Sequence, residues 1–174
     1  MTLYLIDANV LITANNLYYG IEAVPEYWEW LAHHSAQGNM KIPLECYEEI
    51  LDGSNDAERD LLYAWVREEQ HKTAILFEED VDTNLVQSVV TNGYAADLTD
   101  VELEQIGRDP FLIAHALRHP GNRVVVTTER SRPSAQRQNR MIPDVCRAFG
   151  IECFDPFRMY KTLGFSTQWR HGRP

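Results

Sequence analysis

The sequence predicts an α/β fold of three layers, α/β/α, in which helices cover both faces of a central parallel sheet of about four to five strands. Short apolar runs alternate along the chain with longer segments that carry apolar residues at helical spacing. This alternation is typical of parallel strands joined by right-handed helical crossovers. The 174 residues, 44% of them hydrophobic, suit one domain with one core. We expect that domain over residues 1–165, followed by a flexible polar tail over 166–174.

Five segments are strand candidates because each is short, apolar and compatible with extended backbone. They are residues 3–6, 40–42, 72–77, 123–127 and 151–154. The run at 123–127 is the clearest strand, whereas 72–77 fits a strand or a connector. Continuous apolar runs of this kind, without alternating polar residues, indicate strands that are buried on both faces.

Helices are predicted where apolar periodicity coincides with start and stop residues. The predicted segments are 10–16, 24–37, 43–52, 54–66, 81–90, 100–106, 109–117, 143–149 and 156–163. Pro43 suits a first helical turn, and Ser54 or Asn55 suits the N-cap of the next helix. Asp109 is predicted as the N-cap of a helix with Pro110 in its first turn.

Charge is unevenly distributed along the chain. The net charge of −10 argues against a nucleic-acid partner, because binding to a polyanion depends on neutralising phosphates. However, residues 118–140 hold six arginines and one acid, a local charge of +5, whereas 45–109 hold eighteen acids and four bases, a local charge of −14. A basic flap beside an acidic site would suit a metal-dependent nuclease. The alternative is a solvated, arginine-rich loop.

No apolar run approaches the length of a membrane span, and residues 1–7 lack the basic segment and cleavage site of a signal peptide. We therefore expect a cytoplasmic protein without a membrane partner. The three cysteines form no CxxC pair, which favours reduced thiols over a disulfide framework or a zinc ribbon.

Four acidic residues, Asp7, Glu49, Asp109 and Glu129, lie beside apolar runs that are far apart in the sequence. The carboxyl ends of parallel strands form the crevice in which open α/β sheets bind ligands. Several carboxylates there would make an oxygen cage for Mg²⁺ or Mn²⁺. The pattern therefore predicts a metal-dependent enzyme.

Each acid taken alone also has a structural explanation. Asp7 and Asp109 could cap helices, and Glu49 could lie on a solvated helix face. Glu129 could pair with Arg130 or Arg132.

The second acid also has rivals. A helix places Glu45 and Glu49 on one face, with Glu48 one turn from Glu45. The spacing to Gly53 favours Glu49, and Glu48 is the runner-up.

Four sequence blocks together resemble the PIN-domain ribonucleases, especially the VapC-like toxin nucleases of bacteria and archaea. Residues 5–12 (LIDANVLI) look like the opening strand and turn of that family, and 49–53 (EILDG) resemble its ExxxG element. Residues 109–114 (DPFLIA) and 125–129 (VVTTE) are similar to its third and fourth blocks. The blocks occur in family order, and the likeness is strongest to a prokaryotic PIN-like subfamily.

The resemblance implies a PIN-like domain with Mg²⁺- or Mn²⁺-dependent endoribonuclease activity that leaves a 5′-phosphate and a 3′-hydroxyl. It implies that the metal ligands and catalytic residues are Asp7, Glu49, Asp109 and Glu129. The last of these departs from the family pattern, in which an Asp is usual. Residues expected to support the ligands or to position the substrate are Asn9 and Thr127. Candidates for contact with RNA are Arg130, Arg132, Arg137 and Arg140.

The same resemblance implies a toxin that pairs with an antitoxin, and aromatic-rich helices would favour a homodimer. Two alternatives remain open. A catalytically degenerate PIN module would bind RNA or a protein partner without cutting. A haloacid-dehalogenase-like phosphatase would also begin with a strand ending in Asp, but it would place a second Asp at the position of Asn9, and no suitable Lys completes the set.

Overall fold

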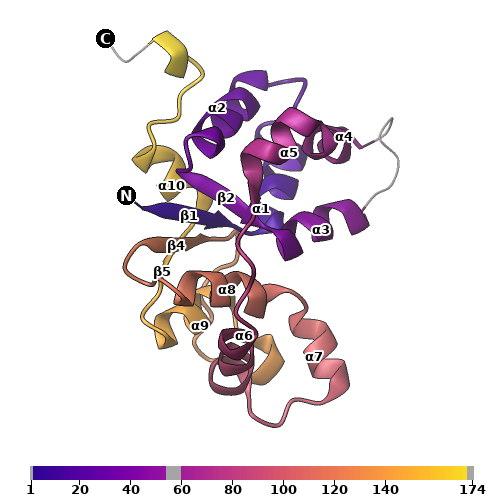
Figure 1. The fold of residues 1–174 in the computed structure, drawn as a ribbon, viewed down its shortest axis with the longest axis vertical. Helices are drawn as coiled ribbons and strands as arrows, with labels where there is room; N and C mark the ends of the chain where they lie inside the picture. Colours follow the sequence, from indigo (N-terminus) through magenta and orange to yellow (C-terminus); the bar gives the residue numbers. More distant parts are fainter. Residues whose placement is uncertain (1, 54–59, 172–174) are drawn as a thin grey trace.

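The computed structural model describes residues 2–53 and 60–171. All five strands are parallel and form one sheet in the order β3-β2-β1-β4-β5. Their bounds are Leu3–Ile6 (β1), Met40–Pro43 (β2), Leu76–Phe77 (β3), Arg123–Val126 (β4) and Glu152–Phe154 (β5). Figure 1 shows α2, α4 and α5 above these strands and α6 to α9 below them. The predicted α/β/α class with a parallel sheet is confirmed.

The described residues form ten α-helices and several shorter helical turns. The α-helices are Ala8–Thr13 (α1), Pro25–Ala36 (α2), Leu44–Gly53 (α3), Leu61–Arg67 (α4), Glu69–Ile75 (α5), Thr83–Ser88 (α6), Asp100–Ile106 (α7), Asp109–Leu117 (α8), Ile142–Ala148 (α9) and Pro156–Thr162 (α10). The π-helical turns Ala14–Tyr18 (η1) and Val89–Tyr94 (η2) extend α1 and α6. The 3₁₀ turns are Arg137–Asn139 (η3) and Trp169–His171 (η4).

Three predicted boundaries differ from the structure. Residues 72–75 belong to α5, so only the last two residues of the predicted strand 72–77 pair in the sheet. Pro43 ends β2 instead of starting a helix. The described part of the helix predicted over 54–66 is α4, which begins at Leu61. The Asp60 carboxylate caps α4 by accepting a hydrogen bond from Tyr63 N. The caps predicted at residues 54 and 55 lie outside the described residues.

The order of the strands places a binding crevice at the centre of the sheet. From β1 the chain passes to β2 and then to β3 on one side, and it returns to the other side of β1 to form β4. A parallel sheet opens a crevice at the carboxyl ends of the strands where the direction of winding reverses. In this fold that point lies between β1 and β4, which pair from Leu3↔Arg123 to Ile6↔Val126.

The core contains the aromatic residues that suggested a dimer contact. Tyr27, Trp28 and Trp30 of α2 are at most 2% exposed, and the Tyr27 and Tyr160 hydroxyl groups are 2.8 Å apart. These rings stabilise the fold by burying large apolar surfaces. They are therefore not available for contact with a second copy of the chain.

The C-terminal segment returns to α2. Trp169 Nε1 donates a hydrogen bond to the Glu26 carbonyl at 3.1 Å, and the Arg170 guanidinium lies 3.1 Å from the Glu29 carboxylate. The first part of the predicted flexible tail, residues 166–171, is thus docked on the domain. Residues 172–174 lie outside the described residues. Among the described helices, none has the length and apolar character needed to cross a membrane.

Gly93 lies at a close packing contact between η2 and α9. A Cβ atom at this position would lie 2.7 Å from Val145 Cγ1 and 3.0 Å from Phe149 Cε2. We predict that Gly93→Ala lowers the free energy of unfolding by about 1–2 kcal/mol, because overpacking outweighs the gain in helix propensity. Gly121→Ala is the control, since nothing lies within 4 Å of its added Cβ. Urea denaturation of both variants tests this, and equal stability of the two would contradict the packing argument.

Candidate functional site

Asp7 follows directly after β1 and is almost completely buried, with 3% of its surface exposed. Its backbone N–H donates to the Val126 carbonyl at 2.9 Å, which extends the pairing of β1 with β4. The Thr127 hydroxyl donates to Asp7 Oδ2 at 2.9 Å. Asp7 occupies the N-cap position of α1, but its side chain makes no capping hydrogen bond. A capping role therefore does not explain this buried carboxylate.

Glu129 lies just beyond β4, on the other strand that borders the crevice. Its backbone N–H donates to Thr127 Oγ1 at 3.2 Å, and its Oε2 accepts a hydrogen bond from Ile142 N at 2.7 Å. Within the described part of the chain it forms no ion pair with Arg130 or Arg132. The start of α9 thus positions the Glu129 carboxylate. The ion pair considered with Arg130 or Arg132 is not formed in the described part of the chain.

Asp109 is the first residue of α8, and Arg108 occupies the position before the helix. The sequence predicted that Asp109 itself caps this helix, and that prediction is wrong. No side-chain capping hydrogen bond is formed there, because the helical backbone already begins at Asp109. Its carboxylate is therefore free to take part in the crevice.

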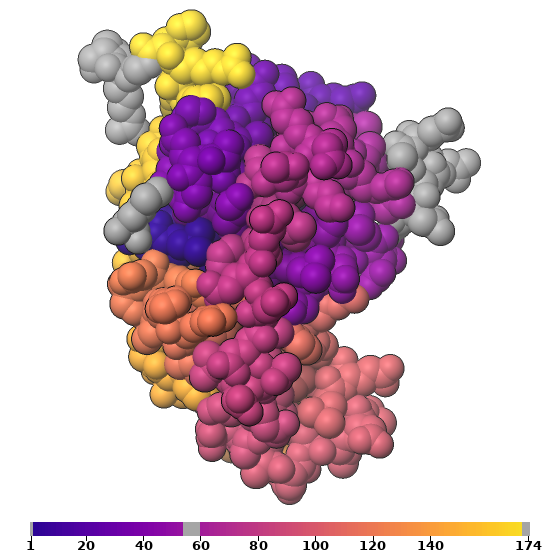
Figure 2. Space-filling model, viewed as in Figure 1, coloured from indigo at the N-terminus to yellow at the C-terminus, as the bar shows by residue number. Residues whose placement is uncertain are grey.

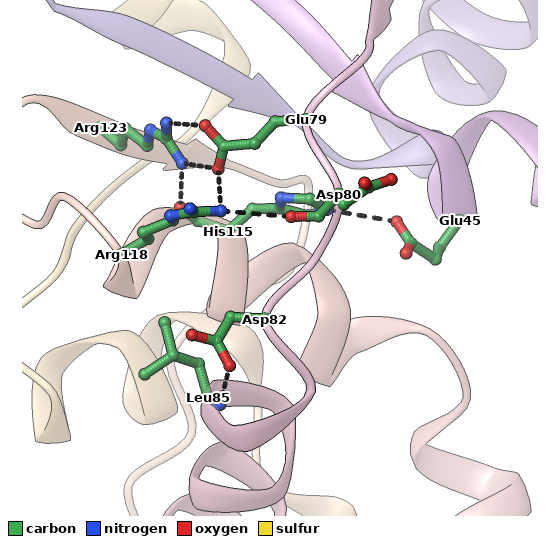
Figure 3. A network of polar contacts seen from close by, with 8 residues as sticks. All are labelled: Glu45, Glu79, Asp80, Asp82, Leu85, His115, Arg118 and Arg123. Carbon is green, nitrogen blue, oxygen red and sulfur yellow. Dashed lines mark hydrogen bonds and ion pairs between the residues drawn. The ribbon is translucent and has the colours of Figure 1, made fainter.

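The structure separates the three rival glutamates of α3. The Glu45 carboxylate lies 3.4 Å from His115 Nε2, as Figure 3 shows, and Glu48 is exposed and lies 4.0 Å from the Arg108 guanidinium. Burial and then the negative charge of Asp7 raise the pKa of Glu49. Glu49 therefore belongs with the crevice acids, whereas the runner-up Glu48 lies at the exposed rim beside Arg108.

The crevice carboxylates oppose one another's ionisation. Burial and then the charges of Glu129, Asp7 and Glu49 raise the pKa of Asp109 to about 8. Burial also raises the pKa values of Asp7, Glu49 and Glu129, and the charge of Asp7 adds to the rise at both glutamates. Carboxyl pKa values rise in this way when the groups are desolvated and lie close to other negative charges. The charges of four acids from distant segments of the chain therefore act on one another.

Two surface hollows reach this site. One, with a volume of about 350 Å³, lies between α3 and the α7–α8 junction, and both Glu49 and Asp109 line it. Figure 2 shows the surface hollowed between α3 and α7. The second has a volume of about 580 Å³, and Glu129 forms part of its wall. Glu49, Asp109 and Glu129 are thus accessible from the surface, whereas Asp7 lines neither hollow.

The donor set suits a hard divalent cation in its chemistry. It offers carboxylate oxygens, which Mg²⁺ and Mn²⁺ prefer, and it carries excess negative charge. No described Lys, Arg or His forms an ion pair with any of the four acids. Within residues 2–53 and 60–171, however, no group of three or more acidic, His or Cys side chains lies close enough together to hold a metal ion.

The four arginines predicted to contact RNA fall into two pairs. Arg137 donates to Glu102 at 2.7 and 2.8 Å and to Asp97 at 2.8 Å. Arg140 donates to the backbone carbonyls of Gly93 and Asp144. These two side chains are engaged within the fold. The side chains of Arg130 and Arg132 form no hydrogen bond or ion pair with a described residue, so they remain available for a ligand.

The other arginines of the basic segment are also compensated. Arg123 forms two hydrogen bonds with the Glu79 carboxylate, at 2.8 and 2.6 Å, and Arg118 lies 3.3 Å from the same carboxylate (Figure 3). Acids from the negative stretch thus neutralise much of the charge that made residues 118–140 appear basic in sequence.

Two further residues shape the site without having been predicted. Arg108 donates to the Glu45 carbonyl at 3.0 Å and to Asp52 Oδ2 at 2.7 Å, so it bridges α3 and α8 at the rim. Asp144 accepts hydrogen bonds from Ser131 Oγ at 2.5 Å and from Arg132 N at 2.6 Å. It therefore holds the segment after Glu129. The sequence signal for Arg108 was its position next to Asp109.

Asn9 is the second residue of α1 and is exposed. It lies close enough to Asp7 to oppose the rise in the pKa of that carboxyl. Its location agrees with either of its predicted roles, as a substrate-positioning residue or as part of the turn into α1.

Comparison with known proteins gives one family. The family model described as "Domain of unknown function (DUF4411)" matches residues 4–167. A comparison with curated proteins finds no match. The matched range includes all four crevice acids and every strand of the sheet, but its description assigns no activity.

The raised pKa of Asp109 predicts how stability depends on pH without metal. The carboxyl titrates at about 8 in the folded protein and near 3.8 when unperturbed. Between these values the folded state holds a proton that the unfolded chain releases, so the free energy of unfolding falls as pH rises from 4 to 8. We expect Asp109→Asn to be more stable than the unsubstituted chain at pH 8, by about 1–3 kcal/mol, with a smaller difference at pH 5.

The measurement is urea denaturation in EDTA across this pH range. Asp80→Asn is the control, since Asp80 is exposed and lies outside the site. A difference between Asp109→Asn and the unsubstituted chain that stays constant with pH would contradict the crowding of the four carboxylates.

Proposed function

We propose that this chain, which belongs to the DUF4411 family, is a metal-dependent endoribonuclease of the PIN type that hydrolyses RNA phosphodiesters. The observation that carries the proposal is the mutual electrostatic effect of Asp7, Glu49, Asp109 and Glu129, which come from four distant segments of the chain, with Asp7 and Glu129 just beyond the carboxyl ends of β1 and β4. Their pKa values are all raised, and none is ion-paired with a described residue. Such a group is costly to ionise without a bound cation.

Mg²⁺ or Mn²⁺ would be held by these four carboxylates. When bound, the cation would supply the positive charge that stabilises a phosphodiester during attack by water. Asp7 and Asp109 are the strongest ligand candidates, because they lie deepest where β1 meets α8. Glu49 supplies a carboxylate from α3, and Glu129 supplies one whose additional methylene extends its reach from β4.

Neighbouring groups hold the ligands in place. The Thr127 hydroxyl orients Asp7, and Ile142 N orients Glu129. Partners of this kind keep a carboxylate in the conformation that binds metal. Arg130 follows Glu129 directly and Arg132 lies three residues beyond it. Their guanidinium groups, which pair with no described residue, suit the phosphates of an RNA strand.

The resemblance to the VapC-like nucleases leads us to propose further that the chain is the toxin of a toxin–antitoxin pair. A cognate antitoxin would then cover the carboxylate site, and the chain could act as a homodimer. The homodimer no longer has support from the aromatic residues of α2, since these lie in the core. A neighbouring gene for a small DNA-binding protein would support the antitoxin proposal.

The nuclease proposal predicts that the purified chain cleaves single-stranded RNA only with added Mg²⁺ or Mn²⁺. Asp7→Asn, Asp109→Asn and Glu49→Gln should each lower the cleavage rate by about a hundred-fold or more, because each removes negative charge from the cation site. Glu48→Gln is the matched control on α3. It should leave the rate within about two-fold of the unsubstituted chain, since Glu48 faces Arg108.

The assay is electrophoresis of a mixed RNA pool before and after incubation. Equal cleavage by all variants in the presence of EDTA would refute the metal-dependent mechanism, because such cleavage would come from a contaminating nuclease. RNA binding without cleavage would indicate the degenerate module, and release of phosphate from a small phosphomonoester would favour the phosphatase alternative.

The metal proposal also predicts stabilisation of the fold. A saturating excess of Mn²⁺, about a hundred times its dissociation constant, should add roughly 2.7 kcal/mol and raise Tm by about 5–10 °C. Asp7→Asn should abolish this shift. Thr127→Val should weaken Mn²⁺ binding by about 10- to 100-fold, because Asp7 loses its hydrogen-bond donor.

Thr162→Val is the control, since Thr162 is exposed and its hydroxyl donates to the Arg158 carbonyl within α10. Differential scanning fluorimetry and isothermal titration calorimetry measure the two effects. An Mn²⁺ shift that persists in Asp7→Asn would place the cation elsewhere.

A further inference from the structure

A second pocket opens beside the carboxylates and has a different chemical character. Its volume is about 580 Å³, which lies within the roughly 300–1,000 Å³ typical of small-molecule sites. Four segments line it: the end of η1, residues 128–131 after β4, Pro143 of α9, and the junction of β5 with α10. Residues 128–131 and the β5–α10 junction lie at the carboxyl ends of strands, so the pocket belongs to the same edge of the sheet as the proposed metal site.

Two exposed aromatic rings form part of the wall of this pocket. Tyr18, the last residue of η1, and Phe157, in the first turn of α10, are each 49% exposed. Their ring centroids are 5.3 Å apart and their planes are inclined by 70°. Among the large apolar side chains that the described structure exposes, these are the two aromatic ones, and both line this pocket. Exposed aromatic surface of this kind indicates a binding site.

The polar wall of the pocket connects the rings to the carboxylates. Glu129 belongs to both the pocket and the proposed metal site, and Arg130 follows it. The guanidinium of Arg130 has no ion-pair partner among the described residues. By contrast, Asp155 is engaged, because its Oδ1 accepts a hydrogen bond from Arg158 N and caps α10. The pocket thus combines two aromatic rings, the Arg130 guanidinium and Glu129, which also belongs to the proposed metal site.

We propose that this pocket binds one unpaired nucleobase of single-stranded RNA next to the scissile phosphate. The base would stack on the face of one of the two rings, Tyr18 or Phe157, and contact the other at an angle, because their planes are inclined by 70°. Arg130 would contact an adjoining phosphate. This inference rests on the proposed nuclease function. Aromatic stacking of single-stranded bases together with a cation on the backbone is a common physical basis for binding without a base-pairing partner. A duplex would be a poor ligand, because its paired bases are not free to enter.

The test uses a short single-stranded RNA that carries one 2-aminopurine, whose fluorescence is quenched on stacking. Titrations with the Asp109→Asn chain, which prevents cleavage, give the affinity. Tyr18→Ala and Phe157→Ala, each added to this background, should weaken binding by about 5- to 150-fold and reduce the quenching. Tyr18→Trp should retain both, because it preserves an aromatic face. Tyr63→Ala, an aromatic truncation on α4 outside the pocket lining, should have no effect.

The contribution of Arg130 is tested by salt dependence. Arg130→Gln should lower the slope of log affinity against log salt by about 0.7, the value for one phosphate contact on a single strand. Arg132→Gln should change the slope less, because Arg132 does not line this pocket. The same RNA annealed to its complement should bind more weakly than the single strand.

The outcomes separate this inference from the nuclease proposal. If the unsubstituted chain cleaves RNA but Tyr18→Ala and Phe157→Ala leave affinity, quenching and kcat/KM unchanged, the base site is refuted and the nuclease stands. If no cleavage occurs with Mg²⁺ or Mn²⁺, the nuclease proposal fails and the titrations alone decide the base site. If the two alanine variants change only the sedimentation mass, the aromatic pair is a contact between protein chains and the inference is overturned.

Discussion

The pairing of β1 with β4 is the interaction on which the candidate site depends. Four residues of each strand pair in parallel, and the Asp7 N–H continues the ladder by donating to Val126. Residues that are about 120 positions apart are thereby brought to one edge, where the Thr127 hydroxyl reaches Asp7. The chain continues from β1 to β2 on one side of this junction and from β4 to β5 on the other. The crevice is a consequence of the strand order.

The second constraint is electrostatic. A fold that places several carboxylates in a poorly hydrated crevice loses stability, since burial and mutual repulsion both oppose ionisation. Elsewhere in this molecule buried or half-buried charges are compensated: Arg123 by Glu79, Arg137 by Glu102, and Asp144 by two hydrogen-bond donors. The four crevice acids differ, because none of them forms an ion pair with a described residue. Uncompensated charge is typical of sites where function, and not folding, determines the residues.

The arginines illustrate why local charge does not predict a binding surface. A count along residues 118–140 suggested one basic flap, but the tertiary structure assigns most of these guanidinium groups to acids or carbonyls on other elements. Arg137 and Arg140 hold η3 and α9 in place, whereas Arg130 and Arg132 are left for a ligand. The positive potential beside the site is therefore smaller and more localised than the sequence indicated. It lies next to the aromatic pair formed by Tyr18 and Phe157.

The sequence by itself determined the α/β class and the parallel strands, because apolar periodicity and strand-terminal residues are local signals. It did not decide between Glu48 and Glu49, since both follow the same helical pattern, and it assigned Asp109 to a cap that the structure does not form. Caps and ion pairs depend on contacts between distant segments. Only the tertiary structure decided which acids share one crevice, which arginines are already paired, and that two exposed rings border the site, because each of these facts depends on how separate elements pack together.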